Sequence, residues 1–105
     1  MITVCVDELT GAALDWAVNQ IEECCDDPTT PRFSTDWAQG GPIIEREEIA
    51  LEPMTHDEHG DGWLATRVEG PAICMEFGQT MLIAAMRCFV ASHLGDEVDV
   101  PEELK

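Results

Sequence analysis

The sequence predicts an α+β fold in which two main helices pack on a small antiparallel sheet. Three observations support this fold class. The chain begins with a short apolar stretch typical of a strand, an apolar stripe with helical spacing follows, and a long apolar segment without carboxylates lies near the other end. With 105 residues, the chain is expected to form a single domain over residues 1–105 with one hydrophobic core.

The first expected elements are a strand over residues 1–7 and a helix that opens within residues 9–18. Thr10 suits the N-cap of this helix. Apolar residues then recur with the spacing of one buried helix face: Leu14, Ala17, Val18, Ile21 and Cys25. Asp27 precedes Pro28, and because a residue before proline is pushed away from the α region, the helix is expected to end there.

Residues 34–44 are expected to form a loop that leads into a short helix over residues 42–47. Gly40 and Gly41 permit backbone angles that other residues avoid. Pro42 suits the first position of a helix, where its missing N–H has no partner to lose.

An antiparallel pair of strands is expected next, over residues 49–51 and 63–68. The polar segment between them, residues 52–62, is predicted to be a hairpin loop. A further short strand is expected over residues 72–77.

The last main element is a helix over residues 81–94, capped by Thr80 and closed by Gly95. Its high apolar content indicates burial over more than one stripe. The acidic C-terminal tail at about residues 96–105 follows, with one more helical turn expected at residues 101–104.

The most prominent feature of the composition is its acidity. The chain has 22 Asp and Glu against 5 Lys and Arg, a formal net charge of −17 at pH 7. This argues against direct nucleic-acid binding, because phosphate contacts are made by Lys and Arg. It suits a basic protein partner, including one that itself handles nucleic acid. The alternative is that the acidity serves solubility alone.

The sequence predicts a cytoplasmic protein with no membrane partner. No run approaches the ~20 apolar residues that cross a bilayer. Residues 1–7 lack the basic start and long apolar stretch of a signal peptide. The five cysteines are an odd number without C-x-x-C spacing, which is typical of free thiols in a reducing compartment.

The candidate binding loop spans Asp36 to Arg46. Glycine pairs let a ligand or another backbone approach closely, and main-chain N–H groups at a helix start favour anions. Trp37 adds a flat apolar surface. The alternative is that the glycines only make a turn while Trp37 fills core space. The candidate site residues are Asp36, Trp37, Gln39, Gly40, Gly41, Glu45, Arg46 and Arg87.

Arg87 belongs to this set because a guanidinium on a largely apolar helix needs a partner if it is buried. Glu45, Asp36 or Glu76 could form a structural ion pair with it. A ligand carboxylate or phosphate would fit the same planar group.

Metal binding is a weaker alternative. His56 and His59 lie close to Asp57, Glu58 and Asp61, but the spacing matches no complete calcium or zinc motif, and a solvated loop is the favoured interpretation. No catalytic residues are predicted, because no nucleophile motif is present, and the sequence therefore argues against an enzyme more than for one. No cofactor is expected.

Three segments of the chain carry a family resemblance: residues 9–18 (LTGAALDWAV), 34–47 (STDWAQGGPIIERE) and 82–104 (LIAAMRCFVASHLGDEVDVPEEL). In this order, they resemble the phage NinX family of uncharacterised phage and prophage proteins. The resemblance implies a gene of a phage accessory region, a location in the host bacterial cytosol, and no known activity. Phe33 and Phe89 stand where the family is expected to favour Tyr, and Met81 where it is expected to favour Pro.

Two functions follow from these observations. The first is a small acidic binding module that acts on a host or phage protein; a basic nucleic-acid-handling protein is one partner that would make use of the acidity. The second is a small-molecule or nucleotide site, enzymatic or not, built from the loop at residues 36–46 and Arg87. A continuous acidic face would favour the first, and a pocket lined by the candidate residues would favour the second.

Overall fold

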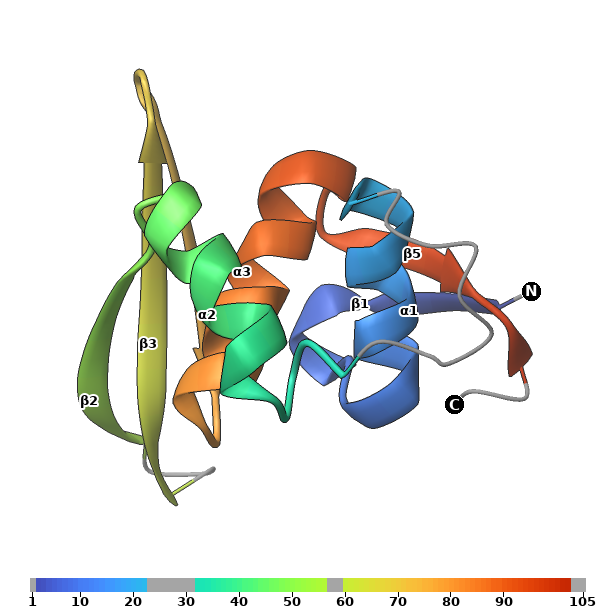
Figure 1. Cartoon of the computed structure of the whole chain (residues 1–105), viewed down its shortest axis with the longest axis horizontal. Coiled ribbons are helices and arrows are strands. Elements are labelled where there is room, and N and C mark those ends of the chain that lie inside the picture. The colour runs from blue at the N-terminus through green and yellow to red at the C-terminus, as the bar shows by residue number, and fades with distance from the viewer. Residues whose placement is uncertain (1, 23–31, 57–59, 103–105) are drawn as a thin grey trace.

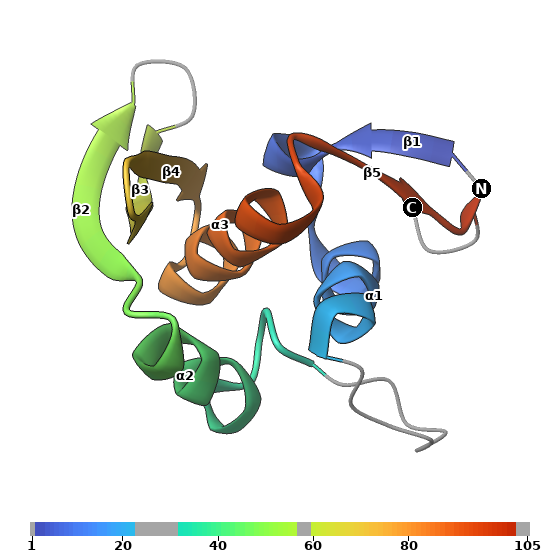
Figure 2. The same ribbon diagram turned by 90° about the horizontal axis from the view of Figure 1, so that it is seen from above.

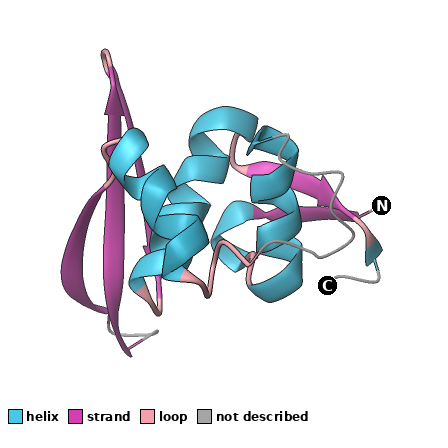
Figure 3. Ribbon diagram, in the orientation of Figure 1, coloured by secondary structure: helices cyan, strands magenta, loops and turns pink. Residues whose placement is uncertain are grey.

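The computed structural model describes residues 2–22, 32–56 and 60–102, and its architecture is α+β, as the sequence predicts. Within these residues, the structure has three α-helices and two antiparallel sheets, which lie at opposite ends of the molecule (Figure 1, Figure 3). Helix α3 lies between the sheets, and α1 and α2 lie along one side of it (Figure 2). The elements in chain order are β1 (Ile2–Cys5), the 3-10 helix η1 (Val6–Glu8), α1 (Gly11–Glu22), α2 (Trp37–Arg46), β2 (Ala50–His56), β3 (Gly60–Glu69), β4 (Ala72–Gly78), α3 (Met81–Leu94) and β5 (Glu97–Val100).

Helix α3 is the centre of the fold and confirms the prediction for residues 81–94. The hydroxyl oxygen of Thr80 accepts a hydrogen bond from the main-chain N–H of Ile83 at 3.1 Å, and Gly95 ends the helix with a φ of 91°. Glycine suits that position because a Cβ atom would be strained there. The buried residues cover more than one side of α3, which lies between the three-stranded sheet and α1 (Figure 2): Leu82, Ala84, Ala85, Met86, Cys88, Phe89 and Val90.

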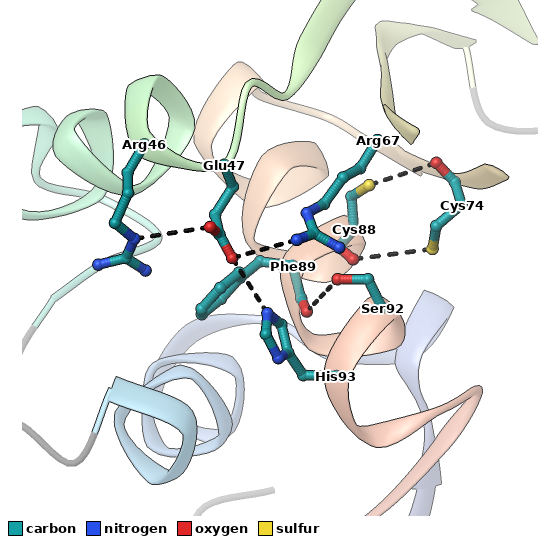
Figure 4. Close-up of polar contacts among 8 residues, drawn as sticks. All are labelled: Arg46, Glu47, Arg67, Cys74, Cys88, Phe89, Ser92 and His93. Atoms are coloured by element: carbon teal, nitrogen blue, oxygen red, sulfur yellow. Dashed lines mark hydrogen bonds and ion pairs between the residues drawn. The ribbon is translucent and has the colours of Figure 1, made fainter. Parts of the chain in front are cut away.

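The three-stranded sheet has the order β2-β3-β4 and packs one face against α3. The contact is close: a Cβ atom on Gly78 would lie 2.4 Å from the main-chain nitrogen of Ala84. The thiol of Cys88 donates to the main-chain oxygen of Cys74 at 3.4 Å, and the thiol of Cys74 donates to that of Cys88 at 3.7 Å (Figure 4). Both cysteines therefore serve as packing residues that also satisfy main-chain carbonyls.

The predicted hairpin loop at residues 52–62 is mostly strand, and that prediction was wrong in its bounds. Strands β2 and β3 continue to His56 and from Gly60, with Glu52 paired to Leu64 and Thr55 paired to Asp61. The ladder is held by main-chain hydrogen bonds, so polar side chains at the exposed ends do not interrupt it. Polarity alone is therefore a poor guide to where a hairpin turns.

The second sheet is a ribbon of two strands, β1 and β5, which pairs the two ends of the chain. The acidic tail contains strand β5, which the sequence analysis did not predict. Val98 and Val100 point into the core while Glu97 and Asp99 are exposed. This alternation is the period of a strand with one buried face, and it was obscured by the charge of the segment.

Candidate functional site

The predicted loop at residues 34–44 is largely replaced by helix α2, which begins at Trp37 and ends at Arg46. The helix therefore begins before the glycine pair and not after it. A carboxylate oxygen of Asp36 accepts the main-chain N–H of Ala38 at 2.9 Å and caps the helix. The prediction was wrong because each glycine costs a helix only about 1 kcal/mol relative to Ala, which capping and packing can offset.

Gly40 serves a close approach between segments. A Cβ atom there would lie 2.3 Å from the main-chain oxygen of Phe33 and 2.7 Å from a methyl carbon of Leu82. At Gly41, by contrast, the nearest atom would be a ring carbon of Trp37 at 3.7 Å, an ordinary contact. Gly40 thus allows the close backbone approach that the sequence predicts. The backbone that approaches it is that of Phe33, and not a ligand.

Gln39 and Asp36 are engaged with each other and with the preceding segment. The Gln39 side-chain amide donates to Asp36 at 3.2 Å, and its oxygen accepts the main-chain N–H of Arg32 at 2.8 Å. These bonds tie the start of α2 to the chain before it.

Trp37 is the candidate residue that is most available to contact a ligand. Its side chain is 52% exposed, and it lines a hollow of about 450 Å³. The hollow is otherwise lined by Ser34, Thr35, Trp63, Gln79, Thr80, Met81, Leu82 and Ile83. None of these described residues carries a charge, so the hollow suits an uncharged group.

Arg87 lies elsewhere, half-buried beside η1 and β4. Its Nε donates to the main-chain oxygen of Leu9 at 2.8 Å and one terminal nitrogen donates to that of Phe77 at 2.7 Å. Of the expected partners Glu45, Asp36 and Glu76, Glu76 lines the same hollow as Arg87, but the hydrogen bonds of the guanidinium go to these two carbonyls. Burial lowers the pKa of Arg87, while Glu76 and Asp7 oppose that change. The guanidinium joins η1, β4 and α3.

A second hollow, of about 470 Å³, is lined by Arg87 together with three carboxylates, Asp7, Glu8 and Glu76. Burial raises the pKa of Glu76, and Asp7 and Asp96 raise it further. The two hollows share Gln79 and Ile83 in their linings. Trp37 and Arg87 therefore line neighbouring hollows and not one common pocket.

Glu47, which the sequence analysis did not single out, is the centre of a polar cluster (Figure 4). Its carboxylate lies 3.0 Å from Nε2 of His93, 3.5 Å from a terminal nitrogen of Arg67 and 3.6 Å from Nε of Arg46. Burial raises the pKa of Glu47, but the hydrogen bond with His93 and the charges of Arg67, Arg46 and His93 outweigh it and hold the pKa below its usual value.

This Glu47 cluster joins the end of α2 to β3 and α3. Of the candidate residues, Arg46 belongs to it and also lies over the ring of Phe89 at 5.8 Å. Glu45 is exposed. No local motif could reveal the cluster, because its members come from three elements far apart in the sequence.

Nucleophilic chemistry finds no support among the described residues near Glu47. The Ser92 hydroxyl donates to the main-chain oxygen of Phe89 at 2.9 Å. Burial raises the pKa of the Cys88 thiol to about 12, and burial also raises that of Cys74. A thiol with a raised pKa is a poor nucleophile at neutral pH.

The metal alternative rests on residues that are largely outside the described part of the chain. Asp57, Glu58 and His59 fall in that gap, and the side chain of His56 is also not described. Within residues 2–22, 32–56 and 60–102, no group of three His, Cys, Asp or Glu is placed to hold a metal ion. In the same residues, no helix has the length and apolar character needed to cross a membrane.

Comparison with known proteins agrees with the resemblance of the three segments. A search of curated proteins found no relative that matches the chain. The model of the family described as bacteriophage P22 NinX matches residues 5–93, which include α1, α2, the three-stranded sheet and nearly all of α3. The chain belongs to the phage P22 NinX family.

Proposed function

We propose that the protein is an acidic binding module that docks a basic protein through the carboxylates around η1 and the start of β5. These residues, here called the acidic patch, are Asp7, Glu8, Glu76, Asp96 and Glu97. They are brought together by the pairing of Cys5 with Glu97 and by a hydrogen bond from the Val6 N–H to the Asp96 oxygen at 2.8 Å. The raised pKa of Glu76 reflects this concentration of like charge as well as burial.

The observation that supports the proposal is the uneven distribution of arginines among the carboxylates. Arg46 and Arg67 lie beside Glu47, which is not part of the acidic patch. Arg87 lies at the patch but donates to main-chain carbonyls. Among the described residues, Arg87 is the cation that lines the hollow beside these five carboxylates, and it already donates to main-chain carbonyls. A partner's Lys or Arg side chains would neutralise the carboxylates. Such complementarity speeds association and selects for basic partners.

The test is capture of host proteins at low salt by the wild type and by two variants of equal net charge. The patch variant is Asp7→Asn/Glu8→Gln/Glu97→Gln, and the matched control is Glu45→Gln/Glu48→Gln/Glu52→Gln, at exposed positions away from the patch. We expect the patch variant to lose the captured basic protein by roughly tenfold or more and the control to retain it. Equal capture by both variants would contradict a localised site.

The partner class is tested with the captured protein itself. If the acidic patch occupies a nucleic-acid-binding groove, duplex DNA should compete for the captured protein, and binding should weaken as salt rises. A captured protein whose binding is insensitive to both would not be a nucleic-acid-handling partner of this kind.

A second candidate function is favoured by one observation, the half-exposed Trp37 in a hollow that also contains Trp63. An uncharged planar ring could stack there and bond to the neighbouring hydroxyl and amide groups. We expect an uncharged nucleoside to quench tryptophan fluorescence in the wild type but not in Trp37→Ala, and its monophosphate to bind more weakly because the chain is anionic. Quenching that persists in Trp37→Ala would place any such site elsewhere.

A further inference from the structure

The face of the three-stranded sheet that points away from α3 is apolar and exposed. The side chains of Val68 and Ile73 are each 65% exposed, Met75 is 55% exposed and Met54 is 42% exposed. The opposite face of the sheet packs on α3 (Figure 2). Ala65 is fully buried. We call the exposed side the outer sheet face, defined by Met54, Leu64, Val68, Ile73, Met75 and Phe77.

Strand register makes these side chains one continuous surface. Val68 pairs directly with Ile73, and Leu64 pairs with Phe77. Phe77 also extends along the sheet, since a Cβ atom on Gly62 would lie 2.4 Å from its Cζ. Contiguous apolar patches of this kind on a protein surface mark sites of association.

Charge is nearly absent from the outer sheet face, although the chain has a net charge of −17. Among the described outward-facing positions of β2, β3 and β4, the one carboxylate is Glu52. The neighbouring charged residues Arg67 and Glu76 belong to the opposite face of the sheet. There, Arg67 contacts Glu47, and Glu76 lines the hollow that also contains Arg87. A basic partner therefore gains little on this surface.

We propose that the outer sheet face is the interface of a reversible homodimer, in which it packs against the same face of a second copy. An apolar surface is complementary to itself, and a two-fold axis brings identical patches together. The outer sheet face is also where two strongly anionic copies can meet with the fewest opposed carboxylates. Face-to-face sheets pack about 10 Å apart, with interdigitated side chains.

The size of the surface limits the strength of the association. Seven residues of strand at ~3.3 Å per residue and three strands at ~4.8 Å spacing give a footprint of roughly 23 by 14 Å per copy. The area buried by two such footprints lies below the ~1,200 Å² of stable complexes. Together with the repulsion between like-charged copies, this predicts a dimer that forms at micromolar to millimolar concentration and strengthens as salt screens the repulsion.

The experiment is sedimentation equilibrium of the full chain over that concentration range, at low and at high salt. We expect the average mass to rise from monomer toward dimer with concentration, and to rise further at high salt. The variant Ile73→Glu/Met75→Glu should weaken the association by roughly 100-fold or more, because it opposes like charges across an apolar contact. The control Leu94→Glu changes another exposed apolar residue, on α3, and should dimerise almost as the wild type does.

Two results would overturn the proposal: a monomer at every concentration and salt, or a dimer that Ile73→Glu/Met75→Glu leaves intact. Circular dichroism of each variant separates lost association from lost folding. The proposed dimer is independent of the acidic patch, because Ile73→Glu/Met75→Glu should still capture the basic protein. The two interactions also respond oppositely to salt: capture of the basic protein weakens as salt rises, whereas dimerisation strengthens. Loss of that capture in the double variant, with a monomeric wild type, would assign the outer sheet face to the basic partner instead.

Discussion

Single residues of this chain carry roles that their sequence neighbourhood does not disclose. Gly40 is needed because a Cβ atom at this position of α2 would lie 2.3 Å from the main-chain oxygen of Phe33. Trp37, three positions earlier, stays half-exposed and is the candidate residue that most plainly remains available to a ligand. The Gly-Gly-Pro sequence suggested close approach correctly, but it could not show which of two adjacent glycines is approached or by what.

Glu47 is the residue whose charge we expect to affect stability most clearly. Its pKa is held below the usual value, so its contribution is present above the pKa of the unfolded chain and is lost as pH falls through the lower folded pKa. Glu47→Gln retains the acceptor oxygen but removes the charge beside His93 and Arg67. We expect the variant to lose about 1 kcal/mol of unfolding free energy at neutral pH, and the difference from wild type to vanish in acid.

Urea unfolding of both proteins at neutral pH and at about pH 3 measures this difference. Glu45→Gln, an exposed change on the same helix, is the control and should have little effect at either pH. A deficit of the same size at both pH values would mean that Glu47 acts through packing and not through charge.

At the scale of elements, the sequence predicts what depends on local signals. Helix α3 was predicted to the residue because Thr80 and Gly95 mark its ends in the chain itself. Strand β5 was missed because its acidic residues concealed the alternation of Val98 and Val100. The early start of α2 was missed because the glycine pair was interpreted as part of a loop, and Asp36 was not recognised as the N-cap.

The candidate functional site was likewise predictable only where it depends on local sequence signals. The candidate residues of α2 were chosen from one contiguous segment, and the structure keeps Trp37 at a hollow while it turns Asp36 and Gln39 toward each other. Arg87 was correctly expected to need partners, but carbonyl oxygens of η1–α1 and β4 supply them. The Glu47 cluster and the acidic patch are assembled from distant segments, so only the fold could reveal them.

For the whole molecule, the repulsion among its many carboxylates makes the stability of the fold depend on salt concentration. The chain extends 36 Å along its longest axis, and the Debye length is about 30 Å at 0.01 M salt but about 10 Å at 0.1 M. At the lower salt concentration nearly all carboxylates repel one another, which destabilises the folded state more than the expanded one. Screening removes this repulsion, while the contacts of the core are uncharged.

We therefore expect the urea midpoint of the monomer to rise as sodium chloride increases from about 0.01 M to about 0.1 M. Urea is required because guanidinium is itself a salt, and a low protein concentration keeps dimerisation from adding to the apparent stability. The acidic-patch variant should show a smaller rise than the Glu45→Gln/Glu48→Gln/Glu52→Gln control, although both have the same net charge. Because only the positions of the removed carboxylates differ, equal slopes would show that the repulsion is spread over the whole surface and not concentrated where the basic partner is proposed to dock.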